Sequence, residues 1–181
     1  MKKNTILFTS LCTILLYCCG SNVDSPKIVE ELKSATSSSF KEDVTADPKM
    51  RSQALGILAH RMKNEPESYA IIEAGVLNYE YVYDGRKMSK KGEYAGDWID
   101  FKNDFTYEYG RYDEIIGSGK YHYSLDKGEM VMVDNDASKN PQEWTIKAGG
   151  DMIVKVGTQT YGNNAFQIKL NRIPQKPVKQ Q

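Results

Sequence analysis

The chain has 181 residues, of which 40% are hydrophobic and 27% are charged, with 24 basic and 24 acidic side chains. This length and composition suit one ordinary globular domain with attached segments and argue against a large multidomain assembly. A formal charge of zero lacks the basic excess that nucleic-acid binding requires, so nucleic acid is not an expected partner.

Residues 1–18 have the features of a signal peptide. Lys2 and Lys3 form a positively charged start, and the apolar run that follows, residues 6–17, is short for a membrane-spanning helix. The end of this run, Leu15-Leu16-Tyr17-Cys18-Cys19-Gly20-Ser21, resembles the lipobox of bacterial lipoproteins, in which a cysteine is acylated and becomes the first residue after cleavage. We assign that cysteine as Cys19, because Cys18 then supplies the small residue at the cleavage position. The alternative is an ordinary secretory signal.

Cleavage before Cys19 would leave a chain with one cysteine, and that cysteine would be lipidated. A disulfide bond, a thiolate nucleophile and a cysteine-ligated metal are then excluded. Acyl chains contribute about 0.8 kcal/mol per buried methylene group, so we expect a protein tethered to a membrane without crossing it. The lipobox resemblance implies a location in the bacterial cell envelope, with the outer membrane as the expected membrane and the leaflet left open.

The segment after the lipobox divides into a spacer and a helical part. Residues 19–47 are rich in Ser and Thr and form the expected lipidated, flexible linker. Residues 48–73 are the expected helical segment, because Asp47-Pro48 supplies an N-cap and a first-turn proline before an amphipathic pattern that runs to about Lys63. A second helical piece is expected to begin near Glu65 and to end at Gly75. We expect the apolar stripe of the first helix to pack on the following domain; the alternative is a helix that binds a partner or lies on a membrane.

Residues 74–173 have the texture of an all-β domain. Short runs with period-two alternation are separated by Gly, Asn and Asp, and no helical pattern lies between them. The expected strands are residues 76–83, two strands within 94–109 that turn at Asn103-Asp104, and residues 115–125, 129–134, 142–148, 152–156 and 165–172. Successive short strands predict an antiparallel meander of about eight strands, closed into a barrel or, as the rival, folded into a two-sheet sandwich.

Four short motifs favour the barrel. In order they are Gly96-Asp97-Trp98, Phe105-Thr106-Tyr107, Gly119-Lys120-Tyr121 and Trp144-Thr145-Ile146, and together they resemble the lipocalin-like domains of exported bacterial lipoproteins. The resemblance implies a mainly β fold: a small antiparallel up-and-down lipocalin-like barrel of about eight strands, preceded by one or two short α-helices. It also implies that Trp98 closes one barrel end beneath Arg172. Residues 174–181 remain as a polar tail.

Catalytic and metal-binding patterns are weak throughout. The two histidines are far apart in the sequence, and the alternation of β residues places His122 on the face opposite its tyrosine neighbours. The oxygen-rich segment 134–140 lacks the glycine and glutamate of a calcium-binding loop, so we expect a surface loop there. We therefore expect a protein that is not an enzyme and that holds no metal or cofactor.

Tyrosines supply the best candidate for a binding site. Rings that share one face of a barrel offer apolar surfaces with hydroxyl handles, which suits a small apolar or amphipathic ligand. The alternative is that the rings only fill the barrel, and that the protein contacts an envelope protein or a glycan through its surface. The candidate ligand-binding residues are Tyr79, Tyr81, Tyr107, Tyr109, Tyr121 and Tyr123.

Overall fold

The computed structural model describes residues 46–67 and 69–179. The predicted signal peptide, the lipidation site Cys19 and nearly all of the predicted linker lie outside these residues. In chain order the described elements are α1 (Pro48–Asn64), α2 (Ala70–Glu73), β1 (Val76–Tyr83), β2 (Asp97–Phe101), β3 (Thr106–Arg111), β4 (Glu114–Ser124), β5 (Glu129–Asp134), β6 (Gln142–Gly149), β7 (Met152–Gly157) and β8 (Gln167–Ile173).

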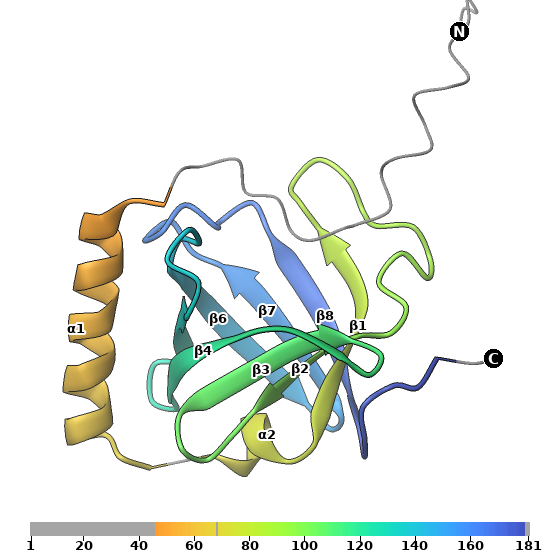
Figure 1. The fold of residues 1–181 in the computed structure, drawn as a ribbon, viewed down its shortest axis with the longest axis horizontal. Coiled ribbons are helices and arrows are strands. Elements are labelled where there is room, and N and C mark those ends of the chain that lie inside the picture. The colour runs from red at the N-terminus through yellow and green to blue at the C-terminus, as the bar shows by residue number, and fades with distance from the viewer. Residues whose placement is uncertain (1–45, 68, 180–181) are drawn as a thin grey trace, which may run out of the picture. The chain divides into compact units, whose positions relative to one another are not determined.

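The eight strands form a closed antiparallel barrel (Figure 1). Each strand pairs with its neighbour in the chain, and β8 closes the sheet by pairing with β1 from Val76↔Ile173 to Tyr83↔Gln167. Closure leaves no exposed sheet edge, which is how short strands joined by tight turns avoid pairing with other chains. The predicted lipocalin-like barrel preceded by short helices is confirmed, and the sandwich alternative is wrong.

Helix α1 lies alongside the outside of the barrel (Figure 1). The predicted cap is present, since the Asp47 carboxylate accepts a hydrogen bond of 2.8 Å from the Lys49 amide. Ala54 and Leu58 are buried on its inner side, where they pack against a small cluster formed by Val131, Val133 and Tyr161. The expectation that the apolar stripe packs on the following domain is confirmed. No helix among the described residues is long and apolar enough to span a membrane.

Helix α2 covers one end of the barrel, called the closed end below. It is a single turn, shorter than predicted, and it stops before Gly75, whose φ of 90° breaks the helix. Ile72 is buried in the barrel core, and Arg172 from β8 donates hydrogen bonds to the carbonyl oxygens of Ala70 (3.4 Å) and Ile71 (2.7 Å). The opposite end carries the β1–β2, β3–β4, β5–β6 and β7–β8 connections and is called the loop end.

The predicted pairing of Trp98 with Arg172 is wrong. Trp98 pairs with Asn78 on the outer face, whereas Arg172 pairs with Leu77 on the inner face, so the two side chains lie on opposite sides of the sheet. Trp98 is fully buried because the C-terminal segment covers it, with the Lys176 ammonium 4.0 Å from its ring centre. Its indole N–H donates 2.8 Å to the carbonyl of Tyr112. Trp98 therefore anchors the tail to the outer wall and does not close a barrel end.

Gly96, the other motif residue, is required by its backbone. Its φ is 84°, and a Cβ placed there would collide with the Tyr112 ring. The Tyr112 amide also donates 2.8 Å to the Gly96 carbonyl. A residue with a side chain would be strained at this position and would displace the hairpin that holds Trp98.

The interior of the barrel is filled by side chains. The inward positions of β2 to β8 carry large aromatic, aliphatic and thioether groups that form one continuous core. Such filling is expected in an eight-stranded barrel, whose interior is just wide enough for side chains. The largest fully buried members of this core are Ile72, Leu77, Phe101, Tyr121, Met130, Trp144, Ile153 and Leu170.

Candidate functional site

The barrel brings five of the six predicted tyrosines to its inner face. Tyr79, Tyr107, Tyr109, Tyr121 and Tyr123 all belong to the core or pack against it. Together with the loop-end connections, these rings define the candidate site.

Tyr81 does not join them. A β-bulge after Tyr79 makes Glu80 an extra residue, so Tyr81 pairs with Lys169, on the outer face. The Lys169 ammonium lies 5.8 Å from the Tyr81 ring centre and 2.6 Å from the Glu80 carboxylate. The prediction that Tyr79 and Tyr81 share a face is therefore wrong, because period two holds only while the pairing register is unbroken.

Two of the inward tyrosines serve the closed end. The Tyr121 hydroxyl donates 2.7 Å to the Glu73 carboxylate on α2 and lies 3.0 Å from the Lys102 carbonyl. Burial, reinforced by the hydrogen bond to Glu73, raises the pKa of Tyr121 far above its ordinary value. Tyr123 packs edge to face on Tyr69, with ring centres 5.6 Å apart. These contacts hold the helical segment onto the barrel, which makes both residues structural.

The other three inward tyrosines lie toward the loop end. Tyr107 and Tyr109 stack with ring centres 6.1 Å apart, and Tyr79 stacks on Tyr94 of the β1–β2 connection at the same separation. Glycine on β4 makes room for them, since a Cβ at Gly119 would lie 2.7 Å from the Tyr107 ring. Burial raises the pKa of Tyr79 and of Tyr107, so both hydroxyls stay protonated and able to donate at neutral pH.

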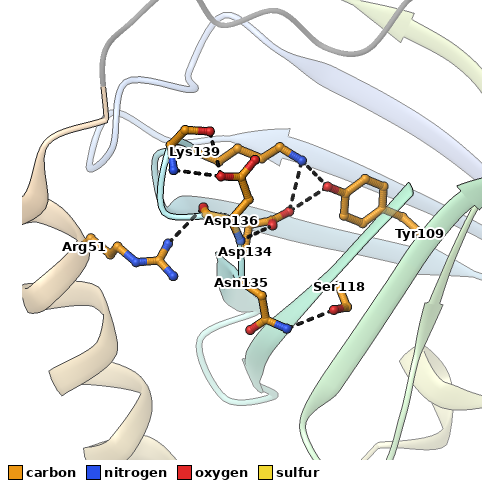
Figure 2. Close-up of polar contacts among 8 residues, drawn as sticks. Arg51, Tyr109, Ser118, Asp134, Asn135, Asp136 and Lys139 are labelled. Carbon is orange, nitrogen blue, oxygen red and sulfur yellow. Dashed lines mark hydrogen bonds and ion pairs between the residues drawn. The ribbon is translucent and has the colours of Figure 1, made fainter. Parts of the chain in front are cut away.

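A polar cluster joins Tyr109 to the β5–β6 connection (Figure 2). The Tyr109 hydroxyl donates 2.8 Å to the Asp134 carboxylate, which is almost fully buried, and Lys139 contacts both groups with its ammonium. The Lys139 ammonium also lies 4.8 Å from the Tyr109 ring centre. The cluster places a buried carboxylate, a phenol and an amine side by side at the loop end.

The same connection carries the oxygen-rich segment that was compared with a calcium loop. Its side chains already have partners in the protein. The Asp136 carboxylate accepts a hydrogen bond of 2.9 Å from the Ser138 amide, and the Asn135 side chain donates one of 2.9 Å to the Ser118 hydroxyl on β4. Arg51 of α1 donates 3.3 Å to the Asp136 carbonyl (Figure 2). In the described part of the chain, no group of three or more His, Cys, Asp or Glu side chains could hold a metal ion.

His122 lies on the outer face, as the alternation predicts. It is fully buried beneath the connection between the two helices, where its Nε2 is 2.8 Å from the Glu65 carbonyl and its ring stacks on Phe105 at 5.7 Å. Phe105 itself has a φ of 62° and sits in the turn before β3. Phe105 therefore does not share the inner face with Tyr107, although the two are two residues apart, because β3 begins only at Thr106.

The barrel wall is least regular between β1 and β2. These strands pair only at Leu77↔Ile99 and Asn78↔Trp98, so the loop-end half of β1 has no β2 partner. The β1–β2 connection covers it instead: the Ser89 hydroxyl accepts from the Val82 amide at 2.9 Å, and the Tyr94 ring packs on Tyr79. A wall made of loop opens more readily than one made of paired strands.

A wide hollow of about 610 Å³ also lies outside the barrel at the closed end. Its lining is mostly polar, and the Glu73 carboxylate within it already accepts a hydrogen bond from Tyr121. The hollow is therefore a poor match for an apolar ligand. Its lining comprises Ala70, Glu73, Ala74, Asp100, Phe101, Lys102, Asn103 and Asp104.

The sequence analysis missed one interior residue, Lys155 on β7. Its side chain is 2% exposed, and its neighbours along the inner face of β7 and β8 are Ile153 and Ile168. Burial lowers the pKa of the Lys155 ammonium to about 7. Alternation within β7 alone could not have found it, because Val154 and Val156 make the opposite face equally apolar.

Comparison with known proteins identifies no relative: no family model, no curated protein and no solved structure matches the chain. Function is therefore argued from the geometry of the barrel.

Proposed function

We propose that the protein is a lipid-anchored protein of the bacterial envelope whose barrel binds or carries a small apolar or amphipathic ligand. The ligand would enter at the loop end, beside Tyr79 and Tyr109. The tether would be Cys19, as the lipobox resemblance implies.

The observation that carries the proposal is the difference between the two barrel ends. At the closed end the inward tyrosines are used to hold α2. Toward the loop end Tyr79, Tyr94, Tyr109 and Phe166 are only partly buried, although they pack against the core. Partly exposed rings with hydroxyl groups and a neighbouring charged cluster are typical of sites that accept amphipathic molecules.

Native mass spectrometry of the full chain, purified gently from its host, tests the ligand. We expect a co-purified small molecule whose mass is lost on denaturation. The matched variants are Tyr79→Ala, which removes an inward ring, and Tyr81→Ala, which removes an outward one. Tyr79→Ala should reduce ligand occupancy at least tenfold, and Tyr81→Ala should leave it unchanged. A chain that is always ligand-free, or equal effects of the two changes, would contradict a site at the loop end.

A second candidate is an interaction protein that contacts an envelope protein or a glycan. It is favoured by the filled core and by two adjacent exposed side chains, Ile115 and Ile116, which are 55% and 52% exposed. Chemical cross-linking in intact cells tests it. A single reproducible partner that is lost in Ile115→Asp supports contact through this surface, whereas a co-purified small molecule without a partner supports the ligand proposal.

The anchor has its own test, which does not depend on the ligand. Cys19→Ala should release the protein from the membrane fraction, because acylation requires the thiol. Cys12→Ala, which changes another cysteine of the signal segment, should leave the protein in that fraction. Retention of the Cys19→Ala variant on membranes would refute the lipoprotein assignment.

A further inference from the structure

The amine of Lys155 has an unusual environment for a charged group. Its Nζ lies 3.3 Å from the Met132 sulfur, 4.4 Å from the Trp144 ring centre and 6.0 Å from the Phe101 ring centre. Among the described residues, no carboxylate forms an ion pair with it. The strongest partner of this amine is therefore a thioether, which is a weak hydrogen-bond acceptor.

This environment favours the neutral amine. Buried lysines are normally paired, because an isolated ammonium in an apolar interior is costly. With its pKa near 7, about half of Lys155 is neutral at neutral pH, whereas an ordinary lysine with a pKa of about 10.4 is neutral in roughly one molecule in 2,500. A desolvated lysine of this kind is a nucleophile toward carbonyl groups.

We infer that Lys155 is a covalent attachment site for an aldehyde-bearing apolar ligand, which the barrel holds as an imine. This inference rests on the proposed ligand-binding function and names the class of ligand. The lone pair of Nζ attacks the carbonyl carbon and forms a C–N bond. The two amine protons and the carbonyl oxygen then leave as water, so that a C=N double bond remains. No oxidant or reductant is needed.

The surroundings favour an aldehyde over a carboxylate. A carboxylate buried beside Lys155 would need several hydrogen-bond donors, but Met132, Phe101 and Ile168 offer none, and the Trp144 indole N–H is directed to the Gln142 side chain at 3.1 Å. A neutral imine needs no counter-ion and few donors. The apolar wall would also keep water away from the C=N bond, which slows its hydrolysis.

The route to Lys155 follows the register of the strands. Lys155 pairs with Ile168, and Ile168 pairs with Val82, so the three lie side by side across β7, β8 and β1. Val82 belongs to the half of β1 that is covered by the β1–β2 connection and not by β2. In this register Ile168 is the one side chain between Lys155 and Val82, so a ligand that displaces the β1–β2 connection and Ile168 would meet the Lys155 amine.

The test uses the full chain, decanal as the probe and sodium cyanoborohydride to reduce any imine to a stable amine at pH 7. Peptide mapping by mass spectrometry locates the adduct. We expect one dominant adduct on Lys155, formed at least 100-fold faster than on the exposed Lys147 of β6. Lys155→Met should lose this adduct, and Lys147→Met should retain it. Lys155→Arg keeps a cation but cannot form an imine, so it provides a second variant that should lose the adduct.

Four results would overturn the inference. One is labelling spread over exposed lysines with Lys155 unmodified. Another is binding of decanoate, detected by native mass spectrometry, without a Lys155 adduct of decanal. Decanol, which has the same chain but no carbonyl, separates this inference from the proposed function: if decanol binds and decanal does not label Lys155, ligand binding stands and the imine fails. If none of the three molecules binds, both fail.

Discussion

Replacing Lys155 by Met should stabilise the barrel and remove a pH dependence of its unfolding. The folded chain holds this amine with a pKa of about 7, whereas the unfolded chain exposes it with a pKa of about 10.4. Between these values the unfolded chain binds the proton and the folded chain does not. Below pH 7 the Lys155 amine lowers the free energy of unfolding by a constant amount, and stability is lowest there. As the pH rises from 7 toward 10.4 this penalty decreases, so stability rises.

The size of the effect follows from the two pKa values. The penalty is on the order of 4 kcal/mol at pH 7 and about 1 kcal/mol at pH 9.5, so the free energy of unfolding should rise by about 3 kcal/mol between them. Methionine has a similar length and no charge, so Lys155→Met should remove most of this slope. The range ends at pH 9.5 because Tyr79 and Tyr107, whose pKa values are raised, add an opposite slope above about pH 10.

Urea unfolding followed by tryptophan fluorescence at pH 7, 8, 9 and 9.5 measures the slope directly. Lys147→Met, which removes an exposed lysine, is the control and should follow the parent chain at every pH. Parallel curves for the parent chain and Lys155→Met would refute the assignment of a buried, unpaired amine.

Three further substitutions, the first with a matched control, test the packing. Leu58→Ala on α1 should lower the free energy of unfolding by about 2–5 kcal/mol, whereas Leu55→Ala on the exposed side should change it by less than about 1 kcal/mol in chemical denaturation. Gly119→Ala should destabilise by about 1–3 kcal/mol and alter near-ultraviolet circular dichroism, because the added methyl group meets the Tyr107 ring; an unchanged spectrum would contradict this contact. Tyr121→Phe should cost about 1–3 kcal/mol and speed amide exchange in α2, and unchanged exchange would mean that its hydroxyl does not hold the helix.

Much of the fold could be predicted because its signals are local. Asp47-Pro48 starts α1 where a cap and a first-turn proline belong, and residues 76–83 and 129–134 coincide with β1 and β5. Short turns then leave the chain few arrangements other than a meander, and closure removes the sheet edges. The order of the barrel strands follows from these local features alone.

The facing of individual side chains was harder to predict, because it depends on register. The bulge at Glu80 changes nothing in the composition of β1, yet it turns Tyr81 outward while Tyr79 stays inward. In β7, Val154 and Val156 make the opposite face as apolar as that of Ile153, so alternation does not distinguish the two sides. Only the pairing of Lys155 with Ile168 shows that the lysine faces inward.

The hydrogen-bond partners of Tyr121 and Lys155 show that Lys155 lowers the stability of the barrel, whereas Tyr121 does not. Both carry a polar atom into the core. The Tyr121 hydroxyl has a carboxylate and a carbonyl as partners, whereas within residues 46–67 and 69–179 the Lys155 amine contacts a sulfur and aromatic faces. A buried polar group that serves only the fold normally has hydrogen-bond partners, because burying it without them costs free energy. Where no such partner is present, a leucine or methionine would fill the same position without that cost. A buried amine whose hydrogen-bond partner is only a thioether, and whose pKa is strongly lowered, is thus better explained by chemistry than by packing. Ligand experiments should therefore begin at Lys155 and the loop-covered half of β1.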